Sequence, residues 1–129
     1  MRWLVLGGGA IVWQSHLPAL VILGWDAGSA VVEPLERNLE RLRAVGSRAD
    51  LIVGSYRDVL SEAGLKDRYD AVLIALPNSM HADAVERCMD AGLPCLCEKP
   101  LGLDSAESRR LGQRAADAGV PLGVAMVRR

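Results

Sequence analysis

The sequence predicts an α/β fold with a doubly wound, mostly parallel six-stranded sheet, and three observations support this prediction. Apolar runs of strand length alternate with segments of helical periodicity along the whole chain. The run YDAVLIALP is apolar on both faces, as a central parallel strand must be. The first strand leads directly into Gly7, Gly8 and Gly9. A glycine turn between the first strand and the first helix is typical of the Rossmann fold.

Length and composition limit the range of folds and functions. The 129 residues are enough for one domain with a substantial core, so we expect a single dinucleotide-binding domain over 1–129. Half of the residues are hydrophobic and none is Phe, which predicts an aliphatic core. A net charge of −1 gives no electrostatic reason to expect nucleic acid or an anionic membrane as a partner. We also expect no membrane span and no secretory signal.

The three cysteines indicate a reducing, cytoplasmic location. Cys88, Cys95 and Cys97 are an odd number of thiols in a chain without a recognisable export signal. Cys95 and Cys97 should share one face of a strand, but this neighbourhood offers too few further ligands for a metal ion. We therefore expect buried, reduced side chains and no metal site.

Strands are expected where short apolar runs lie between turn residues. Because helices separate these runs, neighbouring strands should pair in parallel through right-handed crossovers. Ligands of such sheets bind beyond the carboxyl ends of the strands. The expected strands are 2–7, 29–33, 49–54, 69–77, 94–98 and 121–127.

Helices are expected between the strands. Pro18 lies inside the first and should bend or split it, because proline has no backbone N–H to donate. The third helix has the weakest periodicity. The expected helices are 10–23, 34–46, 55–64, 78–92 and 104–119.

Residues at the helix ends support these assignments. Pro34 suits the first turn of the second helix, whose apolar stripe is Leu35, Leu39 and Leu42. Either Asn78 or Ser79 should cap the fourth helix.

The last helix has its own start signal. Asp104 precedes Glu107 by three residues, which is the spacing of a capping box.

The glycine turn is the first candidate ligand site. Glycine lets the backbone turn sharply and approach a pyrophosphate, while the following helix offers free N–H groups and a partial positive charge. We therefore expect Gly7, Gly9, Ala10 and Ile11 to bind the phosphates of a dinucleotide, with a plain structural turn as the alternative. Val12 replaces the third glycine of the G-x-G-x-x-G pattern, so we expect a wider gap between helix and strand there.

Glu33 is the second candidate. It follows the second strand, 24 positions after Gly9, close to the spacing of a ribose-binding acid. A carboxylate there accepts hydrogen bonds from ribose hydroxyls and repels a 2′-phosphate, which favours NAD. Arg37 keeps NADP open as the alternative. Glu33 could instead serve only as an acid at the start of the next helix.

Longer motifs carry a resemblance to a known family. The stretches VLGGGAIVWQSHLPAL, DAVLIALPNSMHADAVERCMDAGLPCLCEKPLG and GVAMVRR resemble the N-terminal domain of the Gfo/Idh/MocA oxidoreductases. Pro77-Asn78 with His81, followed by Glu98-Lys99-Pro100, is more specific than the glycines. The resemblance implies an NAD(P)-dependent enzyme that oxidises a ring carbinol of a sugar or cyclitol, or reduces the matching ketone.

By this resemblance Lys99 is the catalytic residue and also contacts the cofactor. Its ammonium would hydrogen-bond the reacting oxygen and help to move its proton. An oxidised nicotinamide is cationic, and a nearby cation lowers the pKa of a lysine, so proton and hydride transfer would be coupled. Glu98 would steady the loop or the ammonium, and Pro100 would fix the backbone. The Lys99–Pro100 bond is expected to be trans, with cis as the rarer alternative. The alternative for Lys99 is a solvated loop cation.

The resemblance also assigns neighbouring residues. Pro77 and Asn78 would line the nicotinamide side of the cofactor. His81 is expected to support the site rather than react, and His16 to pack or to cap. Arg128 matches the place where members of the family carry an arginine after the sixth strand.

Members of this family carry a second α/β domain that supplies most substrate contacts, and the sequence shows none. We therefore expect little polyol oxidation by this chain. The alternative functions are a stand-alone dinucleotide-binding module and a sensor subunit without turnover. The expected partners are a nicotinamide dinucleotide, a small polyol or sugar in the full-length parent, and a second copy of the chain.

Overall fold

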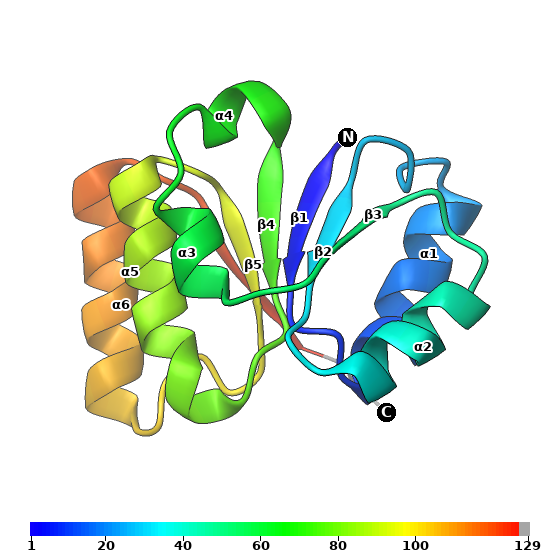
Figure 1. Cartoon of the computed structure of the whole chain (residues 1–129). Helices are drawn as coiled ribbons and strands as arrows, with labels where there is room; N and C mark the ends of the chain where they lie inside the picture. Colours follow the sequence, from blue (N-terminus) through cyan, green and yellow to red (C-terminus); the bar gives the residue numbers. More distant parts are fainter. Residues whose placement is uncertain (127–129) are drawn as a thin grey trace.

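The computed structural model describes residues 1–126 and has a six-stranded sheet in which all strands are parallel (Figure 1). The strand order is β3-β2-β1-β4-β5-β6. This order confirms the predicted doubly wound sheet. The chain changes winding direction between β1 and β4, so their carboxyl ends form the switch point where such sheets bind ligands. The strands are β1 Trp3–Leu6, β2 Ala30–Val32, β3 Asp50–Ile52, β4 Ala71–Ile74, β5 Cys95–Glu98 and β6 Leu122–Ala125.

Helices cover both faces of the sheet. In Figure 1, α1 and α2 lie on one side, and α3, α5 and α6 lie on the other. No helix within residues 1–126 has the combined length and apolarity needed to cross a membrane. The α-helices are α1 Leu17–Ile22, α2 Glu36–Ala44, α3 Tyr56–Leu60, α4 Leu65–Arg68, α5 His81–Ala91 and α6 Ser105–Ala118. A π-helical segment, η1 Val12–His16, precedes α1, and a 3-10 turn, η2 Asn78–Met80, precedes α5.

The core has one part on each face of the sheet because side chains alternate along the strands. Leu4 and Leu6 of β1 are fully buried in the part beneath α3, α5 and α6. Val5, between them, is fully buried in the part beneath α1 and α2. The aliphatic core predicted from composition is therefore divided by the sheet.

Pro18 affects the first helix as predicted, but through an unexpected structure. The segment before it, Val12–His16, winds as a π-helix, and α1 then begins at Leu17. Proline cannot donate to the carbonyl four residues back, and its ring crowds that carbonyl. The wider turn of a π-helix, with hydrogen bonds between residues five apart, gives the proline ring more room beside that carbonyl. Val12 is fully buried with Val5, so the side chain that replaces the third glycine fills core space.

The start of α2 differs from the prediction. The helix begins at Glu36, so Pro34 precedes it, and Leu35 is the extended N-cap residue. Leu35 is 46% exposed, whereas Leu39 and Leu42 are buried as predicted. The predicted stripe was too long because an extended residue does not continue the helical period.

The predicted helix over 55–64 is wrong in extent. The structure has α3, which ends at Leu60, and then α4, which begins at Leu65. Ser55 caps α3, since its hydroxyl accepts a hydrogen bond from the Arg57 N–H at 3.2 Å. Gly64 has a left-handed conformation with φ +74°, and this separates the two short helices.

The two capping predictions have opposite outcomes. Neither Asn78 nor Ser79 caps α5, because the 3-10 turn continues directly into the helix without a side-chain cap. Asp104 does cap α6: its Oδ1 accepts from the Glu107 N–H at 2.8 Å. The Glu107 carboxylate accepts from the Leu103 N–H at 2.7 Å, one residue before the usual capping-box position.

Ion pairs join chain segments at the amino edge of the sheet. Arg2, just before β1, donates from Nη2 to Asp70 Oδ1 at 2.8 Å and from its backbone N–H to Asp70 Oδ2 at 2.7 Å. The side-chain hydrogen bond from Arg2 lowers the pKa of Asp70 to about 2. Asp26, which is buried, accepts from Arg48 at 2.7 Å, and this bond holds the pKa of Asp26 well below its usual range. These pairs fasten the edge opposite the switch point.

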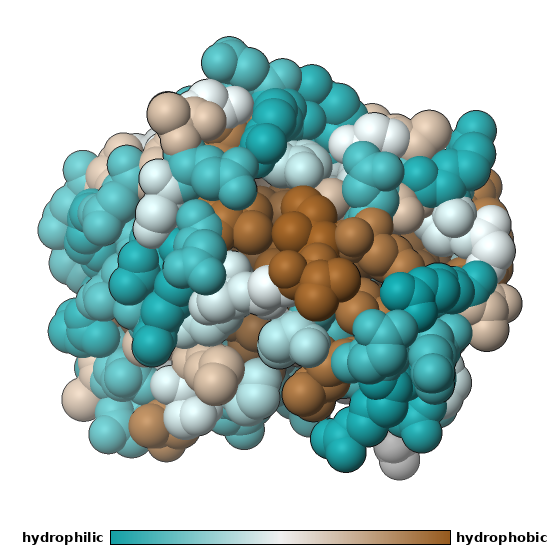
Figure 2. All heavy atoms as spheres, viewed as in Figure 1, coloured by the Kyte–Doolittle hydropathy of each residue, from teal (hydrophilic) through white to brown (hydrophobic). Residues whose placement is uncertain are grey.

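One apolar area stays on the surface. Figure 2 shows hydrophobic side chains gathered in the middle of one face, over the position of β3 in Figure 1. Leu51 and Ile52 of this edge strand are half-buried, and the following Val53 is 66% exposed. The β3 edge is thus apolar and only partly covered.

Candidate functional site

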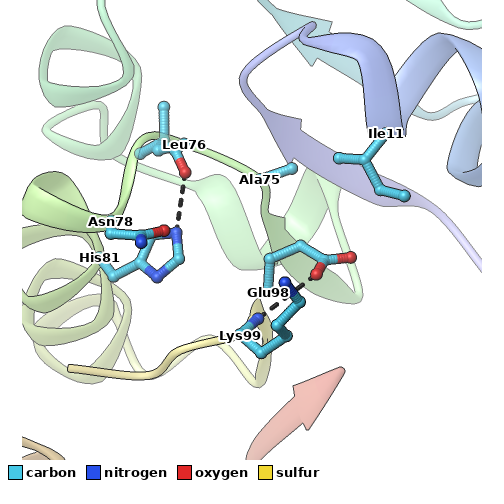
Figure 3. Close-up of a pocket in the computed structure, with 7 residues that line it drawn as sticks. All are labelled: Ile11, Ala75, Leu76, Asn78, His81, Glu98 and Lys99. Carbon is cyan, nitrogen blue, oxygen red and sulfur yellow. Dashed lines mark hydrogen bonds between the residues drawn. The ribbon is translucent and has the colours of Figure 1, made fainter. Parts of the chain in front are cut away.

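Two cavities adjoin each other at the carboxyl edge of the sheet and share Ala75 and Leu76, which follow β4. The first, which we name the lysine cavity, has a volume of about 570 Å³ and is drawn in Figure 3. The second, the glutamate cavity, has a volume of about 450 Å³. Both sizes are typical of small-molecule sites. The lysine cavity is lined by Ile11, Ala75, Leu76, Asn78, His81, Glu98 and Lys99. The glutamate cavity is lined by Gly7, Gly9, Glu33, Pro34, Leu35, Asn38, Gly54, Ser55, Tyr56, Arg57, Ala75, Leu76, Pro77 and Met80.

The glycine turn lies at the switch point, and each glycine meets different surroundings. Gly7 has φ +92°, and a Cβ there would lie 2.6 Å from the Ala75 carbonyl oxygen. A Cβ on Gly8 would lie 2.7 Å from Leu42 Cδ1. A Cβ on Gly9 would meet nothing within 4 Å. The turn therefore packs tightly against the sheet but leaves the Gly9 backbone open to a ligand.

Glu33 is 4% exposed and holds the glycine turn. Its Oε2 accepts from the Gly8 N–H at 2.7 Å, and its Oε1 accepts from the Leu35 N–H at 2.8 Å. A carboxylate has about four lone-pair positions, so each oxygen retains capacity for a further donor. Because Glu33 also lines the glutamate cavity, it can accept from a ligand while it fixes the turn.

Lys99 lies on a bend directly after β5. Its backbone N–H donates to Glu98 Oε2 at 3.3 Å, and the Lys99–Pro100 bond is cis, the rarer alternative at the sequence level. In Figure 3, Lys99 and Glu98 enter the lysine cavity from the end of β5, and Ile11 faces them from the glycine-turn side. The side chain of Lys99 is exposed, so a ligand could reach it.

His81 ties this bend to the end of β4. The ring is 1% exposed; Nδ1 lies 2.7 Å from the Pro100 carbonyl oxygen, and Nε2 lies 2.8 Å from the Leu76 carbonyl oxygen. A backbone carbonyl can only accept, so the ring contacts two acceptors from separate segments. Both contacts suit a structural role for His81.

His16 differs from the packing or capping role expected for it. Its Nε2 lies 2.7 Å from Glu98 Oε1, and the two side chains are 22% and 12% exposed. The pair joins the π-helical segment after the glycine turn to the end of β5. No local pattern predicts this contact, because the two residues are 82 positions apart.

The cap and the first turn of α3 contribute residues that the sequence did not point to, namely Ser55, Tyr56 and Arg57. The strand order could have indicated them, since β3 pairs with β2 and its carboxyl end lies at the same edge. The Tyr56 hydroxyl donates to Asp83 Oδ2 at 2.7 Å, and burial raises the pKa of Tyr56. Burial alone would raise the pKa of Asp83 too, but hydrogen bonds from Arg87, Tyr56 and Arg57 lower it to about 2. Asp83 is therefore a carboxylate at neutral pH.

The structure brings most of the predicted site residues to these cavities. Ala10 is exposed and lines neither cavity, Arg37 is also outside both, and Arg128 lies outside the described residues. Gly7, Gly9, Glu33 and Pro77 line the glutamate cavity, and Ile11, Asn78, Glu98 and Lys99 line the lysine cavity.

The cysteines are unpaired and buried. Burial raises the pKa of the Cys97 thiol to about 12, which keeps it protonated at neutral pH. Within residues 1–126, no three His, Cys, Asp or Glu side chains are grouped so that they could hold a metal ion.

A protein family described as an oxidoreductase family with an NAD-binding Rossmann fold, GFO_IDH_MocA, matches residues 1–126. The chain belongs to the Gfo/Idh/MocA family. It is an NAD(P)-binding oxidoreductase domain of this family, and the adjoining cavities lie where its fold binds ligands.

Relatives in this family carry the names of sugar and cyclitol dehydrogenases. The chain is 41% identical over 123 residues to an inositol 2-dehydrogenase of Mycolicibacterium gilvum, covering 95% of the chain and 34% of that protein. It is 35% identical over 124 residues to a D-xylose 1-dehydrogenase (NADP(+)) of Haloferax volcanii, covering 95% and 36%.

A solved structure has the same fold. The 3-ketoreductase KijD10 of Actinomadura kijaniata, in complex with NADP and TDP-benzene, superposes with a TM-score of 0.78 at 28% identity, covering 97% of this chain and 37% of that one. The chain thus spans about a third of the length of the relatives it matches.

Proposed function

We propose that the chain is the coenzyme-binding domain of a dehydrogenase that transfers a hydride between nicotinamide and a carbinol carbon of a sugar or cyclitol. The observation that carries the proposal is the position of Lys99, in a cavity that adjoins the cavity lined by Gly7 and Gly9. The names of the relatives, inositol 2-dehydrogenase and D-xylose 1-dehydrogenase, support the substrate class.

The residues present fit a dinucleotide. A side chain at Gly7 would collide with the Ala75 carbonyl, so the fold of the turn requires glycine there. The backbone of Gly9 faces open space, so a pyrophosphate could approach it closely. Gly7 and Gly9, with Ala10 and Ile11 in the following turn, would hold the phosphates. Over the whole chain, 1–129, we propose one dinucleotide-binding domain.

The two cavities would divide the coenzyme between them. Glu33 would hold the adenosine half in the glutamate cavity, and Pro77, beside the shared Leu76, would line the nicotinamide side. Asn78, Glu98 and Lys99 would surround the nicotinamide in the lysine cavity.

Lys99 is the proposed proton carrier. The bound coenzyme supplies the hydride acceptor or donor. In the oxidation the neutral Lys99 amine would take the hydroxyl proton at Nζ as the hydride leaves the carbinol carbon; in the reduction the Lys99 ammonium would donate a proton from Nζ to the carbonyl oxygen. The Glu98 carboxylate holds the backbone of the bend, and His81 anchors it to β4, so the amine is presented from a fixed backbone.

We propose NAD rather than NADP as the coenzyme. Glu33 is a buried carboxylate that lines the glutamate cavity, and it would repel a 2′-phosphate. Arg57, which lines the same cavity, is paired with Asp83 at 3.0 Å. KijD10 binds NADP, so the two proteins would differ here.

Titration of the 129-residue chain with NADH, NADPH and their oxidised forms tests coenzyme binding. We expect binding, with NADH preferred over NADPH at least about tenfold, and a preference reduced by Glu33→Ser. Absence of binding by all four would overturn the proposal, and an unchanged preference in Glu33→Ser would overturn the role of Glu33.

A dehydrogenase assay with inositol and xylose tests the chemistry. We expect weak turnover by this chain, and we expect Lys99→Ala to abolish it while coenzyme affinity changes by less than about threefold. Turnover unaffected by Lys99→Ala would contradict the proton-carrying role.

We further propose a cytoplasmic location and self-association. The three unpaired thiols support a reducing compartment, and the apolar β3 edge supports contact with a second copy. Sedimentation velocity at low and high protein concentration measures self-association. A single monomeric species at both concentrations would contradict the proposed self-association.

A further inference from the structure

The proposed reaction does not use the ion pair between Glu98, which lines the lysine cavity, and His16, which lies behind it. The His16 Nε2 and Glu98 Oε1 atoms are 2.7 Å apart, and both side chains are largely buried, at 22% and 12% exposed. Glu98 is the one acid among the residues that line this cavity. In Figure 3 its carboxylate points toward Ile11, on the glycine-turn side. The charge on Glu98 is therefore presented to whatever occupies the cavity.

The net charge of this pair has two values. With a protonated His16 ring, the pair is neutral; with a neutral ring, it carries −1 from the carboxylate. Histidine is the side chain whose charge ordinarily changes near neutral pH. Either form of the ring can donate from Nε2 to Glu98, so the hydrogen bond survives the change of charge.

The two redox forms of a nicotinamide coenzyme differ in the same property. The oxidised ring carries a positive charge, and the reduced ring carries none. The adenosine and the pyrophosphate are common to both, so their contributions cancel when the two affinities are compared. A change of charge beside the ring therefore acts on the ratio of the two affinities.

We propose that protonation of His16 sets the charge that Glu98 presents to the nicotinamide, so that the chain favours oxidised over reduced coenzyme more strongly as pH rises. This inference rests on the proposed function, which places the nicotinamide in the lysine cavity. At low pH the protonated His16 compensates Glu98, and the oxidised ring gains little. At high pH the uncompensated carboxylate attracts the oxidised ring. By linkage, binding of the oxidised form releases protons at intermediate pH.

The size of the effect follows from Coulomb interaction in a partly solvated cavity. One unit of charge several ångströms from the ring changes the affinity ratio by roughly three- to tenfold. Among the described residues 1–126, Lys99 and His81 also line the cavity and can lose a proton, and loss of a proton from either would act in the same direction. The test therefore needs variants that remove His16 and Lys99 in turn, and a contribution from His81 would persist in both variants.

His16→Gln is the matched variant, because the glutamine amide can donate to Glu98 but cannot take up a proton. Lys99→Met removes the exposed amine of the cavity and leaves the pair between His16 and Glu98 intact. Dissociation constants for NAD⁺ and NADH are measured by calorimetry between about pH 6 and about pH 8.5, across the range where histidine ordinarily titrates. Each measurement is made in two buffers of different ionisation enthalpy, so that proton release is read independently of enzymatic activity. Circular dichroism verifies that the variants are folded.

In the wild-type chain and in Lys99→Met, we expect the ratio of Kd for NAD⁺ to Kd for NADH to fall roughly three- to tenfold as pH rises. We expect His16→Gln to keep the high-pH ratio throughout, within about twofold, and to release no protons on binding NAD⁺.

A pH dependence that persists in His16→Gln, or one that disappears in Lys99→Met, would overturn the inference. If both coenzymes bind but the ratio of their dissociation constants does not depend on pH, the inference about His16 is overturned and the proposed function stands. Failure of the wild-type chain to bind either coenzyme would overturn the proposed function as well.

Discussion

At the scale of single residues, the three consecutive glycines illustrate how one motif combines separate requirements. Gly7 needs its positive φ and its close approach to Ala75, and Gly8 needs the space beside Leu42. At position 9 the fold requires neither a positive φ nor a close approach, because an added Cβ would meet nothing within 4 Å. Only a ligand that approaches the backbone would make a side chain at position 9 harmful.

Gly9→Ala should separate binding from folding. We expect the free energy of unfolding to change by less than about 0.5 kcal/mol and the coenzyme affinity to fall by about tenfold or more. Gly112→Ala is the control, because Gly112 is also open but lies in α6, far along the chain. It should raise stability by about 0.5–1 kcal/mol and leave coenzyme affinity unchanged. Equal coenzyme affinity in both variants would refute a pyrophosphate at the turn.

Glu33→Gln should destabilise the chain even without coenzyme. The amide group can accept only through its oxygen, so its nitrogen would face one of the two N–H donors of Gly8 and Leu35. We expect a loss of about 1–3 kcal/mol in urea-induced unfolding. Glu40→Gln, on the exposed side of α2, should change stability by less than about 0.5 kcal/mol. Similar values for the two variants would show that Glu33 does not hold the turn.

Single residues were predictable where they directly follow a strand. Glu33 and Lys99 follow apolar runs, so the alternation of strands and helices was enough to place them at one edge. The contact between His16 and Glu98 was not predictable, because it depends on how a π-helical segment is oriented over β5. A sequence pattern contains no information on that angle.

At the scale of elements, α3 and α5 are joined by one carboxylate. Asp83 accepts from Tyr56, Arg57 and Arg87 at 2.7 to 3.0 Å. These bonds connect the segment that lines the glutamate cavity to a long helix packed on the sheet. The short α3 is therefore fixed by a side-chain network as well as by its own few backbone bonds.

The stabilisation from Asp83 should depend on pH. Its pKa falls from the ordinary value of 3.8 to about 2, so the unfolded chain binds more protons between these values. The contribution is complete above about pH 4 and is lost as pH falls through about 2. Because a third of the side chain is exposed, we expect at most about 1 kcal/mol. Urea unfolding of the wild type and Asp83→Asn should differ at pH 7 and converge near pH 2; a constant difference would contradict this assignment.

Element boundaries were predictable where a residue type imposes one conformation. Gly92 and Gly119 end α5 and α6 in left-handed conformations, as expected for C-terminal glycines. The π-helical segment and the break between α3 and α4 were not predicted. Both depend on how backbone carbonyls are accommodated in the folded chain, which hydrophobic periodicity does not register.

At the scale of the whole molecule, one sheet holds two apolar layers apart. Each layer depends on strand side chains that alternate in direction, and the strands contribute to both. Cooperative unfolding follows from this arrangement, because removal of either layer exposes the same sheet.

Leu6→Ala tests this dependence. Leu6 is fully buried in the layer beneath α3, α5 and α6, so we expect a loss of about 2–5 kcal/mol in a single unfolding transition. Leu103, 67% exposed, is the control, and Leu103→Ala should change stability by less than about 0.5 kcal/mol. Two separate transitions, followed by fluorescence and by circular dichroism, would show that the layers unfold independently.

The ion pair between Arg2 and Asp70 has a practical consequence for immobilising the protein on a surface. It secures the start of β1 at the edge of the sheet opposite the glycine turn, so an affinity handle placed ahead of Met1 would emerge far from both cavities. A biosensor chip that captures the protein through such a handle would leave the lysine cavity and the glutamate cavity facing the solution. Surface attachment at that end should therefore give the same dissociation constants as measurements on the free chain.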